Sequence, residues 1–211
     1  MKEIYTTVAR QAEAEIVEKR SRFIANVKPV KSEEEALEFL NGLKQEYWNA
    51  THNVYAYIIE ENNIMRYSDD GEPGGTAGLP VLDILKKEGL SNVIVVVTRY
   101  FGGVLLGTGG LVHAYSKSAK EGIDAAGLMD VVLCREISLV CDYTLLGKVQ
   151  NLVAGYDGII KGEPIYSDRV DMPVKVPVGD VEKFCADITD KMNAQVKMIM
   201  GDTEYFGRER K

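Results

Sequence analysis

NVIVVVT, residues 92–98, contains five consecutive apolar residues, each branched at its β-carbon. Because these residues do not alternate with polar ones, both faces of the strand that they form are expected to be buried. A glycine-rich segment, RYFGGVLLGTGG (99–110), follows directly, and apolar residues then recur at helical spacing from Leu111 to about Ala125. The sequence therefore predicts a central strand that leads through a glycine loop into a helix.

Local signals predict further elements in the first half of the chain. KSEEEALEFLNGLKQEY (31–47) has an apolar face at helical spacing, with Ser32 as N-cap and Glu35 placed as in a capping box. GLPVLDILKKEG (78–89) predicts a short helix, because Pro80 suits its first turn and a glycine can end it. Strand-like stretches lie at 22–28, 54–59 and 64–67, with a turn at Asn62-Asn63. Because strands and helices alternate, this half is expected to be α/β-like or α+β.

A new pattern begins near Leu133 and follows the order β-α-β-β-α-β, the split-βαβ or ferredoxin-like unit. We therefore predict an α+β protein of two abutting domains, residues 1–130 and 131–211. GLMDVVL (127–133) lies at the boundary and is too short and apolar for a long flexible linker. The predicted elements are a strand at 136–143, a helix at 144–156, strands at 158–166 and 170–178, a helix at 180–192 with Asp180 as N-cap, and a strand at 194–206.

The charge of the chain argues against a generally basic nucleic-acid-binding module. The 211 residues carry a net charge of −7. The first 130 residues contain 14 basic and 19 acidic side chains, and the remainder contains 11 and 13, so both halves are acidic. Neutralised phosphates supply most of the affinity in sequence-independent nucleic-acid binding. Any contact with RNA is therefore expected to use a local basic patch.

Composition also favours a cytoplasmic protein without a membrane segment. No apolar stretch approaches the roughly 18 residues of a membrane-spanning helix, and the N-terminal residues are too polar for a secretory signal. The three cysteines, Cys134, Cys141 and Cys185, are not spaced like metal or redox pairs. Reduced thiols in a cytoplasmic protein fit this pattern best.

The glycine loop at 99–110 has two interpretations. A strand that ends in glycines before a helix can leave free N–H groups for an anion, and Arg99, Thr108 and His113 could add side-chain donors. The segment lacks the spacing of a P-loop or a dinucleotide-binding fingerprint. Its glycines could instead serve close packing of strand and helix.

A second glycine-rich segment, SDDGEPGGTAG (68–78), combines four glycines with three carboxylates. Asp69, Asp70 and Glu72 could ligate Mg²⁺ or Ca²⁺, although their spacing is not that of an EF-hand. The other interpretation is an acidic turn that opens a helix, with Thr76 or Gly78 as the cap. The three acids would also repel a phosphate.

His52 and His113 are the only histidines, and each could be a structural, a surface or a proton-transferring residue. EKRSRF (18–23) brings Lys19, Arg20 and Arg22 together in the one local basic patch that precedes the glycine loops. The alternative for this patch is solvated charge at the edge of a sheet.

Four segments in the same order resemble the IMPACT family, in particular its bacterial YigZ-type members. They are RSRFIANV, THNVYAYI, RYSDDGEPGGTAGLPVLDIL and VTRYFGGVLLGTGGLVHAYSKSA. The match covers Ser21 to Ala119, and the second half resembles the small C-terminal domain of the bacterial proteins. Two positions depart from the family pattern, since Gly74 replaces an expected serine and His113 an expected arginine. The loss of that arginine weakens anion binding at this helix start.

The resemblance implies a first domain like domain 2 of ribosomal protein S5. It also implies a ferredoxin-like second domain similar to the last domain of elongation factor G. Eukaryotic members of the family are translational regulators that compete for the activator of a kinase, a pathway that bacteria lack. Both implied folds recur in translation machinery, although a shared fold alone does not establish a function. The family resemblance, the local basic patch and the glycine loops together lead to the hypothesis of a non-enzymatic protein, without a cofactor, that associates with RNA, the ribosome or a translation factor.

Two further hypotheses stay open. One is a Mg²⁺-dependent protein that binds or hydrolyses a nucleotide or phosphorylated ligand, with both glycine loops at one pocket. The other is an interaction adaptor that uses the sheet face of the second domain. The candidate binding residues are Arg20, Arg22, His52, Gly75, Thr76, Arg99, Gly107, Thr108, Gly109 and His113, and the candidate metal ligands are Asp69, Asp70 and Glu72.

Overall fold

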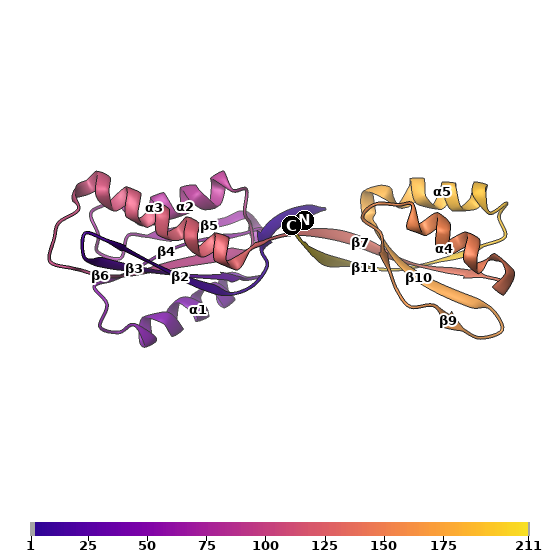
Figure 1. Cartoon of the computed structure of the whole chain (residues 1–211), viewed down its shortest axis with the longest axis horizontal. Helices are drawn as coiled ribbons and strands as arrows, with labels where there is room; N and C mark the ends of the chain where they lie inside the picture. The colour runs from indigo at the N-terminus through magenta and orange to yellow at the C-terminus, as the bar shows by residue number, and fades with distance from the viewer. Residues whose placement is uncertain (1–2, 211) are drawn as a thin grey trace. The chain divides into compact units, whose positions relative to one another are not determined.

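The computed structural model describes residues 3–210 and divides into two compact units (Figure 1). The first unit comprises the described residues up to Asp130 together with those from Gly207 onward, and the second comprises Val131–Phe206. Each unit combines a β-sheet with helices, so the predicted two-domain α+β class is confirmed. The division falls inside one continuous strand, β7 (Leu128–Cys141), where the sequence suggested a short connection.

The first unit is built on a five-stranded sheet in the order β2-β3-β6-β4-β5, in which every neighbouring pair is antiparallel. The strand predicted from NVIVVVT is β6, at the centre of this sheet, and its first seven residues are buried. The prediction of a central strand covered on both faces is therefore confirmed. The strands are β2 (Ala12–Glu18), β3 (Ser21–Pro29), β4 (His52–Ile59), β5 (Ile64–Ser68) and β6 (Val93–Tyr100).

Helices cover the two faces of this sheet separately (Figure 1). One face packs against α1 (Glu33–Glu46), and β6 contributes Ile94 and Val96 to that core. The other face packs against α2 (Gly78–Lys87) and α3 (Gly107–Ala126), and the intervening valines of β6 point into that second core. The alternation of side chains along a strand explains how one apolar run serves both cores.

The helix ends show where local signals succeed and where they fail. Ser32 Oγ accepts a hydrogen bond from the backbone N–H of Glu35, so the predicted N-cap of α1 is confirmed. The predicted cap of α2 is wrong, because the N-cap position belongs to Ala77 and no side chain of the cap residue bonds there. Asp69 satisfies the N-terminus of α2 from eight residues upstream of Ala77.

Two N-terminal strands carried no strong sequence signal. β1 (Ile4–Val8) pairs with β7, and β2 forms a hairpin with β3. The hairpin turn consists of Lys19 and Arg20, with φ values of 44° and 68°. Such turns usually carry asparagine or glycine, because most side chains disfavour positive φ. Because lysine and arginine are unusual in such a turn, the sequence did not predict it.

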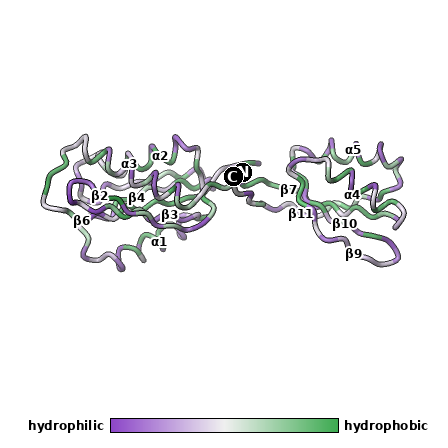
Figure 2. The backbone as a smooth tube through the Cα atoms, in the orientation of Figure 1, coloured by the Kyte–Doolittle hydropathy of each residue, from purple (hydrophilic) through white to green (hydrophobic). Residues whose placement is uncertain are grey.

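The second unit confirms the predicted β-α-β-β-α-β order with one difference. The second predicted strand is divided into two short strands, β8 and β9, which both pair with β10. The strand order is β11-β7-β10-β8, and both helices share one core with the sheet. Figure 2 shows hydrophobic and hydrophilic stretches alternating along these helices. The elements are α4 (Leu146–Ala154), β8 (Ile160–Lys161), β9 (Ile165–Tyr166), β10 (Val170–Pro177), α5 (Val181–Lys191) and β11 (Lys197–Glu209), with short 3₁₀ turns at Tyr143–Leu145 and Val178–Asp180. A third 3₁₀ turn, Glu61–Asn63, belongs to the first unit.

The three cysteines are free thiols, and burial raises the pKa of each above its usual value. They are therefore poor nucleophiles near neutral pH. Among residues 3–210, no helix has both the length and the apolar character needed to cross a membrane.

Packing of α3 on the sheet depends on a glycine, and this gives a prediction. A Cβ at Gly122 would lie 2.8 Å from Val27 Cγ2 and 2.9 Å from Ala25 Cβ. The Gly122→Ala variant is expected to lose about 1–3 kcal/mol of unfolding free energy through overpacking, as measured by urea denaturation. Gly109→Ala is the control, because a Cβ there has no neighbour within 4 Å. Equal stability of the two variants would contradict this account of the packing.

Candidate functional site

Residues from both glycine-rich segments line one pocket in the first unit. The pocket has a volume of about 440 Å³ and is called the loop pocket below. Its lining combines a polar floor with apolar walls. The lining residues are Thr51, His52, Glu72, Pro73, Arg99, Phe101, Leu105, Leu106, Gly107, Thr108 and Leu111.

The first loop is fixed by its own acids. The carboxylate of Asp69 accepts hydrogen bonds from the backbone N–H groups of Gly75, Ala77 and Gly78, at 2.8, 3.1 and 2.8 Å. Asp70 accepts a 2.6 Å hydrogen bond from the N–H of Asn53 at the start of β4. These bonds tie the loop to α2 at one end and to the sheet at the other, as an acidic loop before a helix N-terminus allows.

A buried ion pair forms the floor of the pocket. Arg99 Nη1 lies 2.5 Å from Glu72 Oε1, and only 6% and 3% of their side chains are exposed. Tyr115, on α3, donates a 2.7 Å hydrogen bond to the same carboxylate oxygen. Burial and the neighbouring carboxylate raise the pKa of Tyr115 well above its usual value. The floor is therefore an electrically neutral cluster that joins the first loop, β6 and α3.

His52 lies beside this cluster in a defined orientation. Its Nδ1 is 2.8 Å from the backbone oxygen of Asp70. A carbonyl oxygen only accepts, so Nδ1 carries the proton in this contact. Nε2 then faces the cluster, 3.8 Å from Glu72 Oε1. In the neutral ring this Nε2 is an acceptor, so His52 can accept a proton or a hydrogen bond from a bound molecule.

The second loop is held by close backbone contact. A Cβ at Gly102 would overlap the backbone carbonyl of Arg20 in the β2–β3 turn, so no other residue fits there without movement. The N–H of Gly102 donates a 3.2 Å hydrogen bond to Ser21 Oγ. Arg99 Nη2 lies 3.4 Å from the same oxygen. The hairpin turn and the ion pair thus position the second loop together.

The candidate residues named from the sequence fall into two groups. His52, Arg99, Gly107, Thr108 and Glu72 line the loop pocket. The others lie outside its lining. They are Arg20, Arg22, Gly109 and His113 on the surface, Gly75 and Thr76 at the start of α2, and Asp69 and Asp70 in the first loop.

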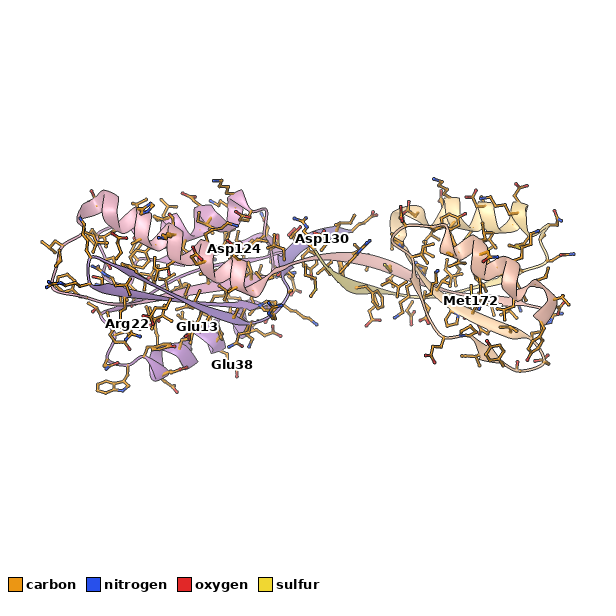
Figure 3. The ribbon with its side chains drawn as sticks, viewed as in Figure 1. Glu13, Arg22, Glu38, Asp124, Asp130 and Met172 are labelled. Carbon is orange, nitrogen blue, oxygen red and sulfur yellow. The ribbon has the colours of Figure 1, made fainter. Side chains whose placement is uncertain are left out.

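Two of the candidate arginines, Arg22 of the predicted basic patch and Arg99 of the second loop, are paired with carboxylates. Arg22, labelled in Figure 3, forms two hydrogen bonds with the carboxylate of Glu15, at 3.0 and 2.8 Å. These bonds raise the pKa of Arg22 and lower that of Glu15. Arg99 is buried against Glu72. Arg20 remains exposed in the hairpin turn.

The three candidate metal ligands face different partners. Asp69 bonds to backbone N–H groups of its own loop, Asp70 to Asn53 and Lys44, and Glu72 to Arg99 and Tyr115. Within residues 3–210, no three side chains of histidine, cysteine, aspartate or glutamate gather closely enough to hold a metal ion. A shared metal would require each carboxylate to leave its present partners.

Several residues of the site had no sequence signal as site residues. Tyr115, which bonds to the pocket floor from outside the lining, recurs at helical spacing, and Leu111 begins the predicted helix. Phe101, Leu105 and Leu106 were only part of a glycine loop. The exposed apolar residues of that loop, Phe101, Val104 and Leu105, were the one available hint, because large apolar side chains in a loop often mark a binding surface.

Comparison with known proteins identifies the family of this chain. Residues 19–123 match the model of the Impact N-terminal domain, and residues 139–195 match a model described as a domain of unknown function, DUF1949. The chain belongs to the IMPACT family. Its loop pocket lies within the Impact N-terminal domain.

Relatives extend over both domains of this IMPACT family chain. It is 42% identical over 203 residues to the IMPACT family member YvyE of Bacillus subtilis, covering 96% of this chain and 93% of the relative. It is 32% identical over 184 residues to YigZ of Escherichia coli, covering 86% and 90%. The Protein IMPACT homolog of Dictyostelium discoideum is 42% identical over 103 residues, covering 46% of this chain and 29% of the relative.

A solved structure has the same fold. A crystal structure described as that of a hypothetical protein superimposes with a TM-score of 0.61 at 29% identity, covering 96% of this IMPACT family chain and 99% of the other.

The buried ion pair gives a second prediction. Arg99→Met leaves the carboxylate of Glu72 buried without its cation, so the variant is expected to lose about 3–5 kcal/mol of unfolding free energy. The double variant Glu72→Gln/Arg99→Met removes both charges and is expected to lose less. Urea denaturation followed by circular dichroism measures both. A double variant no more stable than Arg99→Met would contradict the pairing.

Tyr115 gives a prediction about pH. Its raised pKa means that the folded state keeps the proton that the unfolded state loses near pH 10, so stability falls as pH rises above about 10. Tyr115→Phe is expected to cost about 1–3 kcal/mol at neutral pH, because it removes the buried hydrogen bond to the Glu72 carboxylate. The difference from the unchanged protein should shrink above pH 10.

The control for this experiment is Tyr143→Phe, at an exposed tyrosine of the second unit. Urea denaturation between pH 7 and about pH 11 measures the three proteins, a range that spans the usual tyrosine pKa. A constant difference between Tyr115→Phe and the unchanged protein would show that Tyr115 ionises normally.

Proposed function

We propose that this chain is a non-enzymatic factor of the translation machinery that holds a ribosomal protein or a translation factor at the loop pocket. The main observation in support of this proposal is that both glycine-rich segments of the family signature line this one pocket. Family membership supports the link to translation through the regulatory role that the resemblance implies. The proposal places the protein in the cytoplasm, where free cysteines remain reduced.

The apolar rim of the pocket supports a protein partner. Leu105 is 83% exposed, and Phe101 and Val104 beside it are also exposed. Large apolar side chains clustered on one loop are costly to leave in water and typically mark an interaction surface. A partner that buries them would gain roughly 25 cal/mol per Å² of apolar surface.

The paired arginines make RNA a weaker candidate for the partner. Arg22 already binds Glu15, and Arg99 is buried with Glu72, so neither offers a free charge to a phosphate. The first domain is also acidic in total charge. RNA binding would depend steeply on salt, because it releases counterions. Contact through the apolar rim would depend on salt only weakly.

Sedimentation of cell extracts tests this proposal. Sucrose gradients in low and moderate salt should show the protein in ribosomal fractions, or in a complex with a translation factor, under both conditions. Leu105→Asp should move it to the top fractions, because a charge on the rim opposes burial. Val17→Asp is the matched control, since Val17 is 62% exposed on β2 and lies outside the pocket lining.

Two results would count against the proposal. If the unchanged protein stays in the top fractions at both salts, no stable association with the machinery exists. If association is lost only on raising the salt and Leu105→Asp has no effect, the partner is RNA and binds elsewhere.

Convergence of the loops also supports a second candidate, a small-molecule site for a nucleotide or phosphorylated ligand. Its proposed Mg²⁺ ligands are the three carboxylates, which would have to leave their present hydrogen bonds. Thermal-shift measurements with nucleotides, with and without Mg²⁺, test it. A ligand at 100 times its Kd would stabilise the protein by about 2.7 kcal/mol, and no shift would eliminate this candidate.

A further inference from the structure

His52 presents an unused hydrogen-bond acceptor at the loop pocket. Its Nδ1 donates to the backbone oxygen of Asp70, so Nε2 of the neutral ring carries the free lone pair. No residue among 3–210 donates a hydrogen bond to Nε2, and Glu72 Oε1, 3.8 Å away, is itself an acceptor.

This acceptor is open to solvent. The polar side-chain atoms of residues 3–210 that are both fully buried and unpartnered do not include Nε2, and 19% of the His52 side chain is exposed. His52 also lines the loop pocket. A molecule in the pocket can therefore donate a hydrogen bond to Nε2.

The floor beside His52 offers further acceptor capacity and no net charge. Arg99 and Tyr115 both donate to Glu72 Oε1, and no residue among 3–210 donates a hydrogen bond to Oε2. An anion would face these lone pairs without a free cation, because Arg99 is already paired. A cation would lie close to the charge of Arg99. A neutral group that donates a hydrogen bond fits this floor best.

The walls of the pocket require a large apolar body around that donor. They include Pro73, Phe101, Leu105, Leu106 and Leu111, and the volume of about 440 Å³ is within the range of sites that hold a small organic group.

Among protein side chains, tryptophan combines these two properties. Its indole ring is large and apolar, and its one polar atom is an N–H that donates and cannot accept. The tyrosine hydroxyl brings lone pairs as well, and a nucleobase brings acceptor atoms and a phosphate. Buried tryptophan N–H groups usually find an acceptor, and tryptophan is enriched among the residues that dominate binding energy at protein interfaces.

We propose that the loop pocket receives a tryptophan side chain of the partner protein, with the indole ring against the apolar walls and the indole N–H donated to His52 Nε2. The inference rests on the proposed function, since it names the group of the protein partner that this pocket holds.

Four probes test this chemistry on the full chain. N-acetyl-tryptophanamide represents the side chain, and N-acetyl-1-methyltryptophanamide keeps the ring but lacks the N–H. N-acetyl-tyrosinamide carries a hydroxyl, and adenosine represents a nucleobase. The tryptophan probe is expected to bind with a Kd of about 1 mM. The methylated probe is expected to bind at least about fivefold more weakly, because it leaves the acceptor unsatisfied.

The ring nitrogens of the histidines report the contact itself. The chain contains two histidines, and His113 is exposed on α3 outside the pocket lining. Long-range ¹H–¹⁵N correlation spectra of labelled protein, at about pH 8 to favour the neutral ring, record both. The tryptophan probe should shift the Nε2 signal of His52 and leave the signals of His113 in place. The methylated probe should shift Nε2 of His52 much less.

A pair of matched variants tests the role of His52. Asparagine keeps an N–H donor close to the position of Nδ1, which bonds to Asp70, and has no counterpart of Nε2. His52→Asn should weaken binding of the tryptophan probe at least about fivefold and remove its advantage over the methylated probe. His113→Asn is the control and should preserve both. The comparison of the two probes on the unchanged protein tests the same contact without any variant.

The results separate this inference from the proposed function. The inference is overturned if the tryptophan probe does not bind at about 10 mM, or if the methylated probe, N-acetyl-tyrosinamide or adenosine binds as well. It is also overturned if His52→Asn leaves binding unchanged. Probe binding without association in the sucrose gradients would overturn the proposed function alone. Association in the gradients without probe binding would overturn this inference alone.

Discussion

The buried ion pair between Glu72 and Arg99 is the interaction on which the rest of the site depends. Glu72 belongs to the first glycine loop and Arg99 to the end of β6, and Tyr115 adds a hydrogen bond from α3. One carboxylate oxygen therefore joins a loop, the central strand and the long helix. Because a buried charge without its partner is strongly unfavourable, neither loop can move far without breaking the pair. The pair itself leaves the pocket floor with no net charge.

Sequence reasoning recovered the parts of the fold that rest on local patterns. The buried run of β6, the capping box at Ser32 and Glu35, and the order of elements in the second domain depend on residues close in the chain. The turn at Lys19 and Arg20 was not predicted, because its conformation is unusual for such residues. Asp69 was not predicted as the cap of α2, because its hydrogen-bond partners lie six to nine residues further along the chain.

The site was only partly predictable for the same physical reason. Arg99, His52 and Glu72 stood out by residue type. However, Glu72 is 27 residues from its partner Arg99 and 43 residues from its partner Tyr115. No local pattern encodes such a pairing. The structure also gives these residues other roles than the predicted ones. Arg99 and Glu72 form an ion pair with each other, and Asp69 caps a helix.

Hydrogen exchange in the variant Glu72→Gln/Arg99→Met tests most directly whether one buried pair holds both loops. This variant removes the pair without leaving a charge in the core. The account predicts faster amide exchange at both 68–78 and 101–110, with the second unit unchanged, because local stability reports the contacts that hold a segment. Faster exchange in one loop alone, or in neither, would contradict it.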